Sequence, residues 1–168
     1  DGGAKVIADM VVNHIEGDYG WCGFAVQDFG EYGRFEVDGS YIANSDEMNT
    51  DPSAGGCNGQ ATGGNDDGYG GESNYGAARD FAHTNEKVRQ MFRAYAKWMI
   101  DVVNYDGFRY DYCKGFHMSH VDDYNANGGA YFSVLEYYDG NPDVLWSRIQ
   151  DARENTLAFD FGMKYNVL

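Results

Sequence analysis

The stretch GFRYDYCKGF, residues 107–116, joins the pattern of a strand to a cluster of charges. Aromatic residues occupy every second position at its start, which is the period of a β-strand. Arg109, Asp111 and Lys114 place three formal charges within and just after that strand. A functional site at the end of a Gly107–Tyr112 strand would explain why a buried strand ends in formal charges.

Strand and helix patterns alternate around this stretch. Strands are predicted at Ala4–Val12, which reads as buried on both faces, at Tyr131–Glu136 and at Leu157–Phe161. Helices are predicted at Glu86–Val103 with Asn85 as N-cap, at Ser119–Asn125, and after Asn141 and Pro142. The apolar face of the first helix comprises Val88, Met91, Phe92, Tyr95, Met99, Val102 and Val103. This alternation predicts an α/β fold with a parallel sheet flanked by helices.

A long irregular region separates the first strand from the first helix. From Ile15 to His83 there is little helical period and much Gly, Asn, Asp and Tyr. Such a stretch is unusual inside a compact domain, and a linker would seldom contain Trp21 and so many tyrosines. We therefore expect an inserted loop subdomain that a ligand, a metal or a disulfide stabilises.

Three cysteines exclude a fully paired framework within the chain. Cys22 and Cys57 both lie in the irregular region and could pair with each other. Cys113 follows a strand, and we expect it to be a free buried thiol.

The composition limits the classes of partner. The chain has 168 residues, 43% of them hydrophobic, and a net charge of -15. This charge argues against nucleic acid or an anionic membrane surface, since both need basic patches. No apolar run has the length of a transmembrane helix. The chain opens with neither an initiator Met nor a secretory signal pattern, so we expect a mature form or a fragment.

Polar residues follow three of the predicted strands. They are Asp9, Asn13 and His14 after the first, Arg109, Asp111 and Lys114 in the second, and Glu136 and Asp139 after the third. Taken alone, Asp9 is explained as an acceptor for buried backbone donors, and Arg109 with Asp111 as a buried ion pair. Parallel α/β folds build their sites at the carboxyl ends of strands, so three such ends favour a site.

Two of these carboxylates have the placement of a glycosidase pair. Arg109 and Asp111 lie on the same face of the strand, and a guanidinium beside Asp111 favours the anion that a nucleophile needs. Glu136 comes from the next strand, at a spacing of roughly 4.8 Å, so the two carboxyls could lie about 5 to 5.5 Å apart, as in retaining glycosidases. The sequence places no cation next to Glu136, which permits it to hold a proton for the leaving oxygen.

Three motifs together resemble the α-amylases of glycoside hydrolase family 13. DMVVNH (Asp9–His14) is similar to the family's D-x-x-x-N-H, GFRYDYCKG to its G-F-R-x-D-x-x-K, and VLEYYDG to the region around its catalytic Glu. Their order and spacing agree with the family, and FDFGMKY resembles its sixth-strand region more weakly. The resemblance covers nearly the whole chain.

The resemblance implies a partial (β/α)8 TIM barrel, roughly strands three to six, with an inserted irregular B-type subdomain. Residues 1–14 would form barrel strand three, residues 15–83 the insertion, and residues 84–168 the helices and strands four to six. The first two and last two strands would be absent, because a whole barrel typically has about 250 residues.

The resemblance also implies residue roles. Asp111 would be the nucleophile and Glu136 the general acid/base, while Arg109 orients the nucleophile and keeps it charged. His14 would contact the sugar at the cleavage site, and Lys114 the sugar on the leaving-group side.

A calcium ion is implied as cofactor. Its ligands would be the side-chain oxygen of Asn13, the backbone carbonyl of Gly115, and Asp80 in ARDFAH. Weaker candidates, which a solvated acidic loop explains equally well, are Asp66, Asp67 and Glu72.

The sequence departs from the family pattern at a few places. Leu135 stands where most amylases have a small residue, and Tyr138 where Trp is common. The fourth family motif, F-x-x-N-H-D, which supplies the third catalytic carboxylate, does not occur. We expect retaining endo-hydrolysis of α-1,4-glucosidic bonds in starch-like glucans by a secreted, monomeric parent protein, and no appreciable activity from this chain alone.

Three alternatives remain. The intermediate on the nucleophile could pass to a sugar acceptor, which would make the protein an α-glucan transglycosylase. The protein could be a catalytically silent carbohydrate- or calcium-binding protein on the same scaffold. His117, His120 and Asp122 in HMSHVDD could share a zinc ion, although surface histidines explain this motif more simply.

Overall fold

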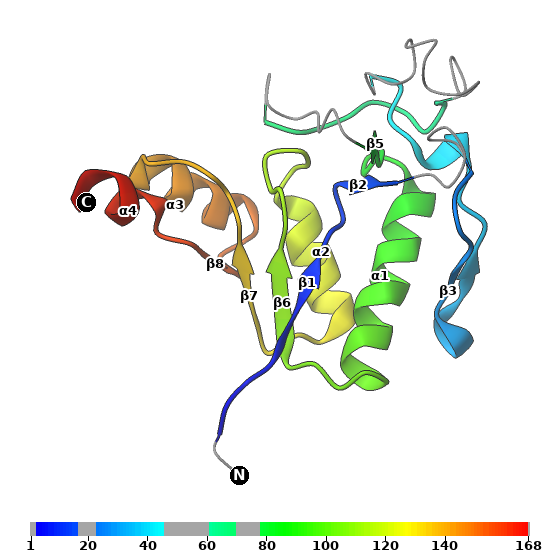
Figure 1. The fold of residues 1–168 in the computed structure, drawn as a ribbon, viewed down its shortest axis with the longest axis horizontal. Helices are drawn as coiled ribbons and strands as arrows, with labels where there is room; N and C mark the ends of the chain where they lie inside the picture. Colours follow the sequence, from blue (N-terminus) through cyan, green and yellow to red (C-terminus); the bar gives the residue numbers. More distant parts are fainter. Residues whose placement is uncertain (1–2, 17–22, 46–60, 70–77, 168) are drawn as a thin grey trace.

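Four parallel strands form the main sheet. The structure is a computed structural model that describes residues 3–16, 23–45, 61–69 and 78–167. The strands lie in the order β1 (Ile7–Met10), β6 (Gly107–Tyr110), β7 (Phe132–Leu135) and β8 (Leu157–Ala158) (Figure 1). The predicted α/β fold with a parallel sheet is confirmed at this level.

Helices connect and follow these strands. They are α1 (Glu86–Asp101), α2 (Ser119–Gly128), α3 (Pro142–Asp151) and α4 (Phe161–Val167). Both predicted caps are confirmed, because Asn85 Oδ1 accepts a hydrogen bond from Lys87 N and Asn141 Oδ1 accepts one from Asp143 N, each at 3.0 Å. Within the described ranges, no helix has the length and apolar character needed to cross a membrane.

The last predicted strand is too long. β8 ends at Ala158, and α4 begins at Phe161, where a strand was expected to continue. The side chain of Asp160 accepts a hydrogen bond from Met163 N at 2.7 Å, the geometry of a helix N-cap. This cap favours a helix over further strand.

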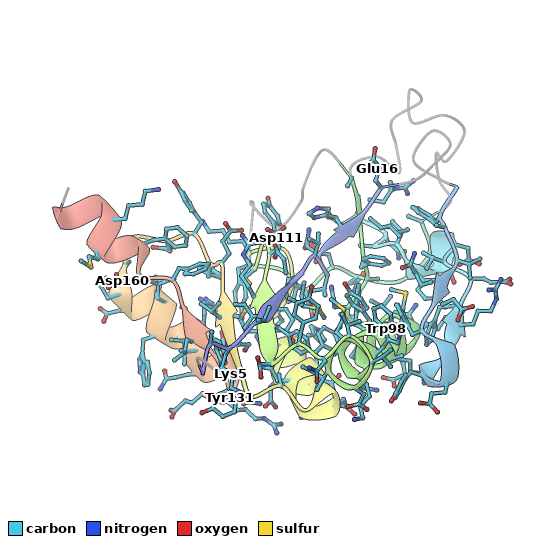
Figure 2. The ribbon with its side chains drawn as sticks, turned by 60° about the horizontal axis from the view of Figure 1, so that its bottom comes forward. Lys5, Glu16, Trp98, Asp111, Tyr131 and Asp160 are labelled. Carbon is cyan, nitrogen blue, oxygen red and sulfur yellow. The ribbon has the colours of Figure 1, made fainter. Side chains whose placement is uncertain are left out.

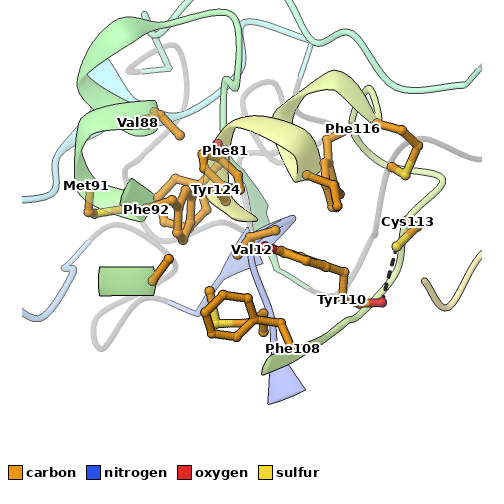
Figure 3. Packing of buried hydrophobic residues seen from close by; sticks show 14 of the residues in the cluster. Val12, Phe81, Val88, Met91, Phe92, Phe108, Tyr110, Cys113, Phe116 and Tyr124 are labelled. Atoms are coloured by element: carbon orange, nitrogen blue, oxygen red, sulfur yellow. Dashed lines mark hydrogen bonds between the residues drawn. The ribbon is translucent and has the colours of Figure 1, made fainter. Parts of the chain in front are cut away.

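One face of the sheet packs against α1 and α2. Apolar side chains of the sheet and the two helices pack together there (Figure 3). Their burial removes apolar surface from water, which stabilises the fold by about 25 cal/mol for each Å² buried. Residues of this core include Ala8, Met10, Val12, Val88, Met91, Phe92, Ala96, Phe108, Tyr110, Phe116, Val121, Tyr124 and Leu135.

The predicted apolar face of α1 is correct over most of its length. Val88, Met91, Phe92 and Met99 are buried, and Tyr95 is partly buried against the core. The prediction is wrong for Val102 and Val103, which are 57% and 41% exposed because the helix ends at Asp101.

The face of β1 that points away from α1 and α2 is exposed to solvent. Ala8 and Met10 are buried, whereas Asp9 and Val11 on the other face are exposed. The prediction that Ala4–Val12 is buried on both faces is therefore wrong, since the helices pack only against the face of Ala8 and Met10.

Two short strand pairs precede α1 in the described residues, the first beyond the carboxyl ends of β1 and β6 and the second beside α1 (Figure 1). β2 (His14–Ile15) pairs antiparallel with β5 (Arg79–Asp80), and β3 (Gln27–Asp28) with β4 (Arg34–Phe35). Two 3₁₀ helices, η1 (Gly30–Tyr32) and η2 (Gly39–Tyr41), belong to the same stretch of sequence before α1. The proposed boundaries of an inserted subdomain stay a prediction. Trp21, Cys22, Cys57 and Glu72 fall outside the described residues, and so does the possible pairing of the two cysteines.

Candidate active site

The predicted site residues gather where three parallel strands end. The register places Asp9 of β1 beside Arg109 of β6, and Arg109 beside Val134 of β7. Asp111 lies at the far end of β6 from Lys5 and Tyr131 (Figure 2). Because strands in a parallel sheet share a direction, their polar carboxyl ends meet at one edge.

Arg109 connects three carboxylates. Its Nη1 lies 2.6 Å from Asp9 Oδ1 and 2.6 Å from Asp111 Oδ1, and its Nη2 lies 2.8 Å from Glu136 Oε1. Burial alone would lower the pKa of Arg109, but the hydrogen bond to Asp9 and the negative charges of Glu136 and Asp111 outweigh it and raise that pKa. The guanidinium therefore stays cationic and holds the predicted nucleophile and the predicted acid/base together.

The two predicted catalytic carboxylates rest on ordered backbone. Asp111 N donates to Met10 O at 3.1 Å, and Glu136 N donates to Tyr110 O at 2.9 Å. These bonds extend the sheet ladder past the ends of the strands, so both carboxylates project from a rigid edge.

Glu136 has a cation beside it that its neighbours in the sequence do not supply. Arg109 is opposite Val134, and Glu136 lies two residues beyond Val134 on the same face of the sheet. A long guanidinium side chain spans that offset. Pairing between strands therefore supplies a cation that sequence neighbours did not reveal.

Asp9 is a site residue that sequence reasoning placed at a strand end without a role. Its side chain is 61% exposed and contacts Arg109, so the explanation that it accepts from buried backbone donors is wrong. The signal that would have found it is the parallel register, which aligns Asp9 with Arg109.

The chain turns sharply after Asp111. Tyr112 has a φ of 47°, a left-handed conformation that is uncommon for a bulky residue. Cys113 follows with its N–H donating to Glu136 O at 3.2 Å and its Sγ donating to Tyr110 O at 3.2 Å. Burial raises the pKa of the Cys113 thiol well above its ordinary value, and the prediction of a free buried thiol is confirmed.

This turn borders a cavity of about 240 Å³ beside Glu136. Its lining residues are Tyr112, Cys113, Lys114, Glu136 and Tyr138. Two aromatic rings, a lysine and a carboxylate suit a polar ring-shaped ligand, since sugars offer both apolar faces and hydroxyl groups.

His14 lies close enough to Asp111 to feel its charge. Its ring meets that of Tyr112 edge to face, with centroids 6.2 Å apart. Burial lowers the pKa of His14, against the opposing effect of the Asp111 charge, so the imidazole is neutral at pH 7. A neutral ring offers both a donor and an acceptor for sugar hydroxyls.

The three predicted calcium ligands also lie together. Asn13 and Asp80 are buried, and Asn13 Nδ2 donates to Asp80 Oδ1 at 3.1 Å. Asn13 Oδ1 is buried without a hydrogen-bond partner among the described residues. A Cβ on Gly115 would lie only 1.7 Å from that oxygen, so the backbone of Gly115 passes directly beside it.

These residues fit a hard cation. A buried amide oxygen without a donor costs about 1–3 kcal/mol, and a cation would relieve that cost. In the part of the chain that the structure describes, no three His, Cys, Asp or Glu side chains gather as a metal site. A metal here would therefore depend on amide and backbone oxygens as well as Asp80, a donor set that suits calcium.

The weaker calcium candidates have protein partners. Asp67 Oδ2 lies 2.7 Å from His120 Nε2, and Asp67 Oδ1 accepts from His117 N at 3.2 Å. Asp66 Oδ1 accepts from Gly68 N at 3.0 Å. The solvated-loop explanation is therefore wrong for Asp67.

The zinc alternative loses its support for a similar reason. His120 is buried and bound to Asp67, whereas the Nδ1 of His117 lies 2.9 Å from Ser119 Oγ. Asp122 Oδ1 accepts from Asn155 Nδ2 at 3.3 Å. The explanation of surface histidines is also wrong for His120, because α2 buries its ring.

Comparison with known proteins agrees with the resemblance. No protein-family model matches the chain. Over 66 residues the chain is 38% identical to "Alpha-amylase 3, chloroplastic" of Arabidopsis thaliana, a match that covers 39% of this chain and 7% of that protein. Over 135 residues it is 28% identical to "Probable alpha-amylase 2" of Arabidopsis thaliana, covering 80% of this chain and 28% of that protein. The chain thus spans less than a third of these relatives, and it is a distant homologue of the plant α-amylases.

Proposed function

We propose that the longer protein to which this chain corresponds is a retaining glycoside hydrolase that cleaves α-1,4-glucosidic bonds within starch-like glucans. The observation that carries the proposal is the contact of one guanidinium, that of Arg109, with both Asp111 and Glu136 at neighbouring strand ends. This pair lies in a chain homologous to α-amylases. Two carboxylates on one edge are the arrangement that glycoside hydrolysis uses.

In the proposed reaction, the Asp111 carboxylate attacks the anomeric carbon and forms a glycosyl ester. Glu136 gives a proton to the departing glycosidic oxygen as that bond breaks. The Glu136 carboxylate then takes a proton from water, and the water oxygen displaces Asp111 from the sugar. Neutral His14 and the ammonium of Lys114 bind hydroxyl groups on either side of the scissile bond.

The contact between Arg109 and Glu136 has a consequence for this mechanism. Glu136 must be protonated to act as an acid, and a protonated carboxyl no longer forms an ion pair. We propose that Glu136 leaves Arg109 when substrate binds, while Arg109 remains on Asp111. A third carboxylate, expected outside this chain, would complete the site.

Calcium is part of the proposal. Asn13, Asp80 and the backbone of Gly115 would hold the ion, which would join the end of β1 to β5 and to the turn after Asp111. Its role would be structural, because it would fix the segments that bear His14 and Lys114. The partial (β/α)8 barrel is proposed on the same basis as the activity.

The proposal is tested by Asp111→Asn and Glu136→Gln in the longer protein. Each variant should keep its circular dichroism spectrum and lose about 10⁴-fold or more of its turnover of starch, because each removes a reacting group. Asp101→Asn, at the exposed end of α1, is the matched control and should retain full turnover. Near-normal starch hydrolysis by Asp111→Asn would sink the assignment.

The missing fourth family motif favours a catalytically silent role for the isolated chain. F-x-x-N-H-D, which would supply the third carboxylate of the proposed site, does not occur in the sequence. Purified 168-residue chain should therefore show no appreciable glucan hydrolysis. Analysis of products from the longer protein separates hydrolysis from transfer, since a transglycosylase would lengthen glucan chains.

The expected partners follow from this chemistry. An α-glucan is the substrate, whereas nucleic acid and anionic membranes are disfavoured by the charge of -15. A monomeric state and secretion stay predictions. Secretion gains no support from the relatives, one of which is named as a chloroplastic protein.

A further inference from the structure

The segment that ends in Tyr69 binds the turn that follows the predicted nucleophile. Tyr69 N donates to Lys114 O at 2.8 Å, and Met118 N donates to the Tyr69 hydroxyl at 3.1 Å. The Tyr69 ring stacks on that of His117, with centroids 5.3 Å apart. One residue from a distant part of the chain thus contacts both ends of residues 114–118.

Two residues of α3 also contact Tyr69. Its hydroxyl donates to Asp151 Oδ2 at 2.8 Å, and the guanidinium carbon of Arg148 lies 3.9 Å from the centroid of its ring. Arg148 Nη1 in turn binds Asp151 Oδ2. Because Asp151 and Arg148 belong to a packed helix, Tyr69 is fixed relative to the sheet rather than only to its own loop.

The charge state of Tyr69 suits this role. Burial raises the pKa of Tyr69 to about 12, against the opposing hydrogen bond from Met118 and with the support of Asp151. The hydroxyl therefore keeps its proton at physiological pH and donates to Asp151 while it accepts from Met118 N.

Lys114 is the first residue of the segment that Tyr69 binds. Its carbonyl accepts from Tyr69, and its side chain extends along the cavity that Glu136 also lines, with Nζ 5.8 Å from the centroid of Tyr137. Tyr112, two residues earlier, has a strained left-handed conformation. A turn with such strain stays in place only when its surroundings hold it.

We propose that Tyr69 is a positioning residue, which holds the turn after Asp111 so that Lys114 meets the sugar on the leaving-group side. The inference rests on the proposed function. Tyr69 touches neither substrate nor reacting atoms, and acts through the backbone of Lys114 and Met118. The irregular region before α1 thereby shapes the leaving-group half of the site.

The first test compares two substrates in the longer protein. Tyr69→Phe keeps the ring on Arg148 but removes the hydroxyl. It should raise KM and lower kcat/KM about tenfold for maltoheptaose, whose leaving group is a sugar. The leaving group of 4-nitrophenyl maltoside offers Lys114 no sugar hydroxyls. For this substrate kcat/KM should stay within about twofold, because a misplaced Lys114 affects only substrates whose leaving group it binds.

Two variants sharpen this test. Lys114→Ala should show the same selective loss, and Tyr69→Phe combined with Lys114→Ala should lose little more than Lys114→Ala, since both act through one contact. Tyr131→Phe, an exposed tyrosine at the opposite end of the strands, is the matched control and should change neither substrate. Equal losses on both substrates, or additive losses in the double variant, would overturn the proposal.

A second measurement does not depend on activity. In the longer protein, Tyr69→Phe should speed hydrogen exchange in a peptide covering residues 112–119 and speed tryptic cleavage after Lys114. Exchange in residues 86–101 of α1 should not change. Unchanged exchange and cleavage at the turn would overturn the proposal even in an active enzyme. If the unmodified longer protein hydrolyses neither substrate, the proposed function fails, while the exchange result still decides whether Tyr69 holds the turn.

Discussion

At the scale of single residues, the site depends on the shape of one side chain. Arg109 presents two terminal nitrogens in a plane, and these contact Asp111 and Glu136 separately. A lysine has one ammonium and cannot occupy both positions. Charge alone is therefore insufficient at this position.

Arg109→Lys tests that statement. We expect kcat/KM on starch in the longer protein to fall roughly 100-fold, because the two carboxylates lose their common partner and shift. Arg34→Lys is the control, since Arg34 forms an exposed pair with Asp28 and should tolerate the change. Full activity of Arg109→Lys would show that position, rather than the guanidinium fork, matters.

Gly115 is the second residue whose shape matters. A methyl group there would meet Asn13 Oδ1, so Gly115→Ala should lower the free energy of unfolding by about 1–3 kcal/mol. Urea denaturation measures the loss. In an Asn13→Ala background the clash is absent, and the same substitution should cost much less. A cost that is equal in both backgrounds would contradict this packing.

At the scale of elements, helix caps serve two different purposes. Asn141 caps α3 through its side-chain oxygen. Asn85 caps α1 in the same way, but its Nδ2 also donates to Ser40 O and Gly63 O, each at 2.9 Å. The cap of α1 thereby ties the helix to the irregular region before it.

Replacement by aspartate separates these purposes, because it keeps the accepting oxygen and removes the donors. Asn85→Asp should lower the free energy of unfolding by about 1–3 kcal/mol, since two carbonyl groups lose their donor and face a carboxylate. Asn141→Asp, which keeps every bond of the cap, should stay within about 0.5 kcal/mol. Equal effects in urea denaturation would mean that Asn85 acts as a cap alone.

At the scale of the whole molecule, a neutral histidine connects the segment after β1 with helix α2. His83 is buried, its Nε2 donates to Val12 O at 2.9 Å, and its Nδ1 accepts from the Tyr124 hydroxyl at 2.7 Å. Burial lowers the pKa of His83, and the nearby His120 lowers it further, against the opposing charge of Asp67. The uncharged ring therefore links the end of β1 to α2 in the folded chain.

This arrangement predicts how stability depends on pH. Below about pH 6.5 the unfolded chain binds a proton at His83 that the folded chain does not. The free energy of unfolding should therefore fall on acidification from that pH, by up to about 1.4 kcal/mol per pH unit, before carboxylates titrate. His83→Gln should be less stable at neutral pH and show a shallower decline. Parallel curves for the two proteins would contradict this role of His83.

The reach of sequence-based prediction differs among these features. The order of the four main-sheet strands and of α1 to α3, the caps at Asn85 and Asn141, and the buried thiol of Cys113 depend on neighbours in the chain, and these were predicted correctly. α4 was missed because the apolar run at LAFDF is compatible with a strand, and the capping bond of Asp160 forms only when the helix does. The cation beside Glu136 was missed because it comes from another strand.

The sequence by itself determined the parallel α/β fold and the residue types at the strand ends, because alternation, caps and motifs are local properties. Only the tertiary structure decided how those residues meet. Parallel register brought Asp9 to Arg109 across 100 positions, and packing brought Asp80 to Asn13 across 67. Tyr69 reached the turn at Lys114 in the same manner. Contacts of this kind depend on strand pairing and helix packing, and no local pattern specifies the few ångströms that separate a bound carboxylate from a distant one.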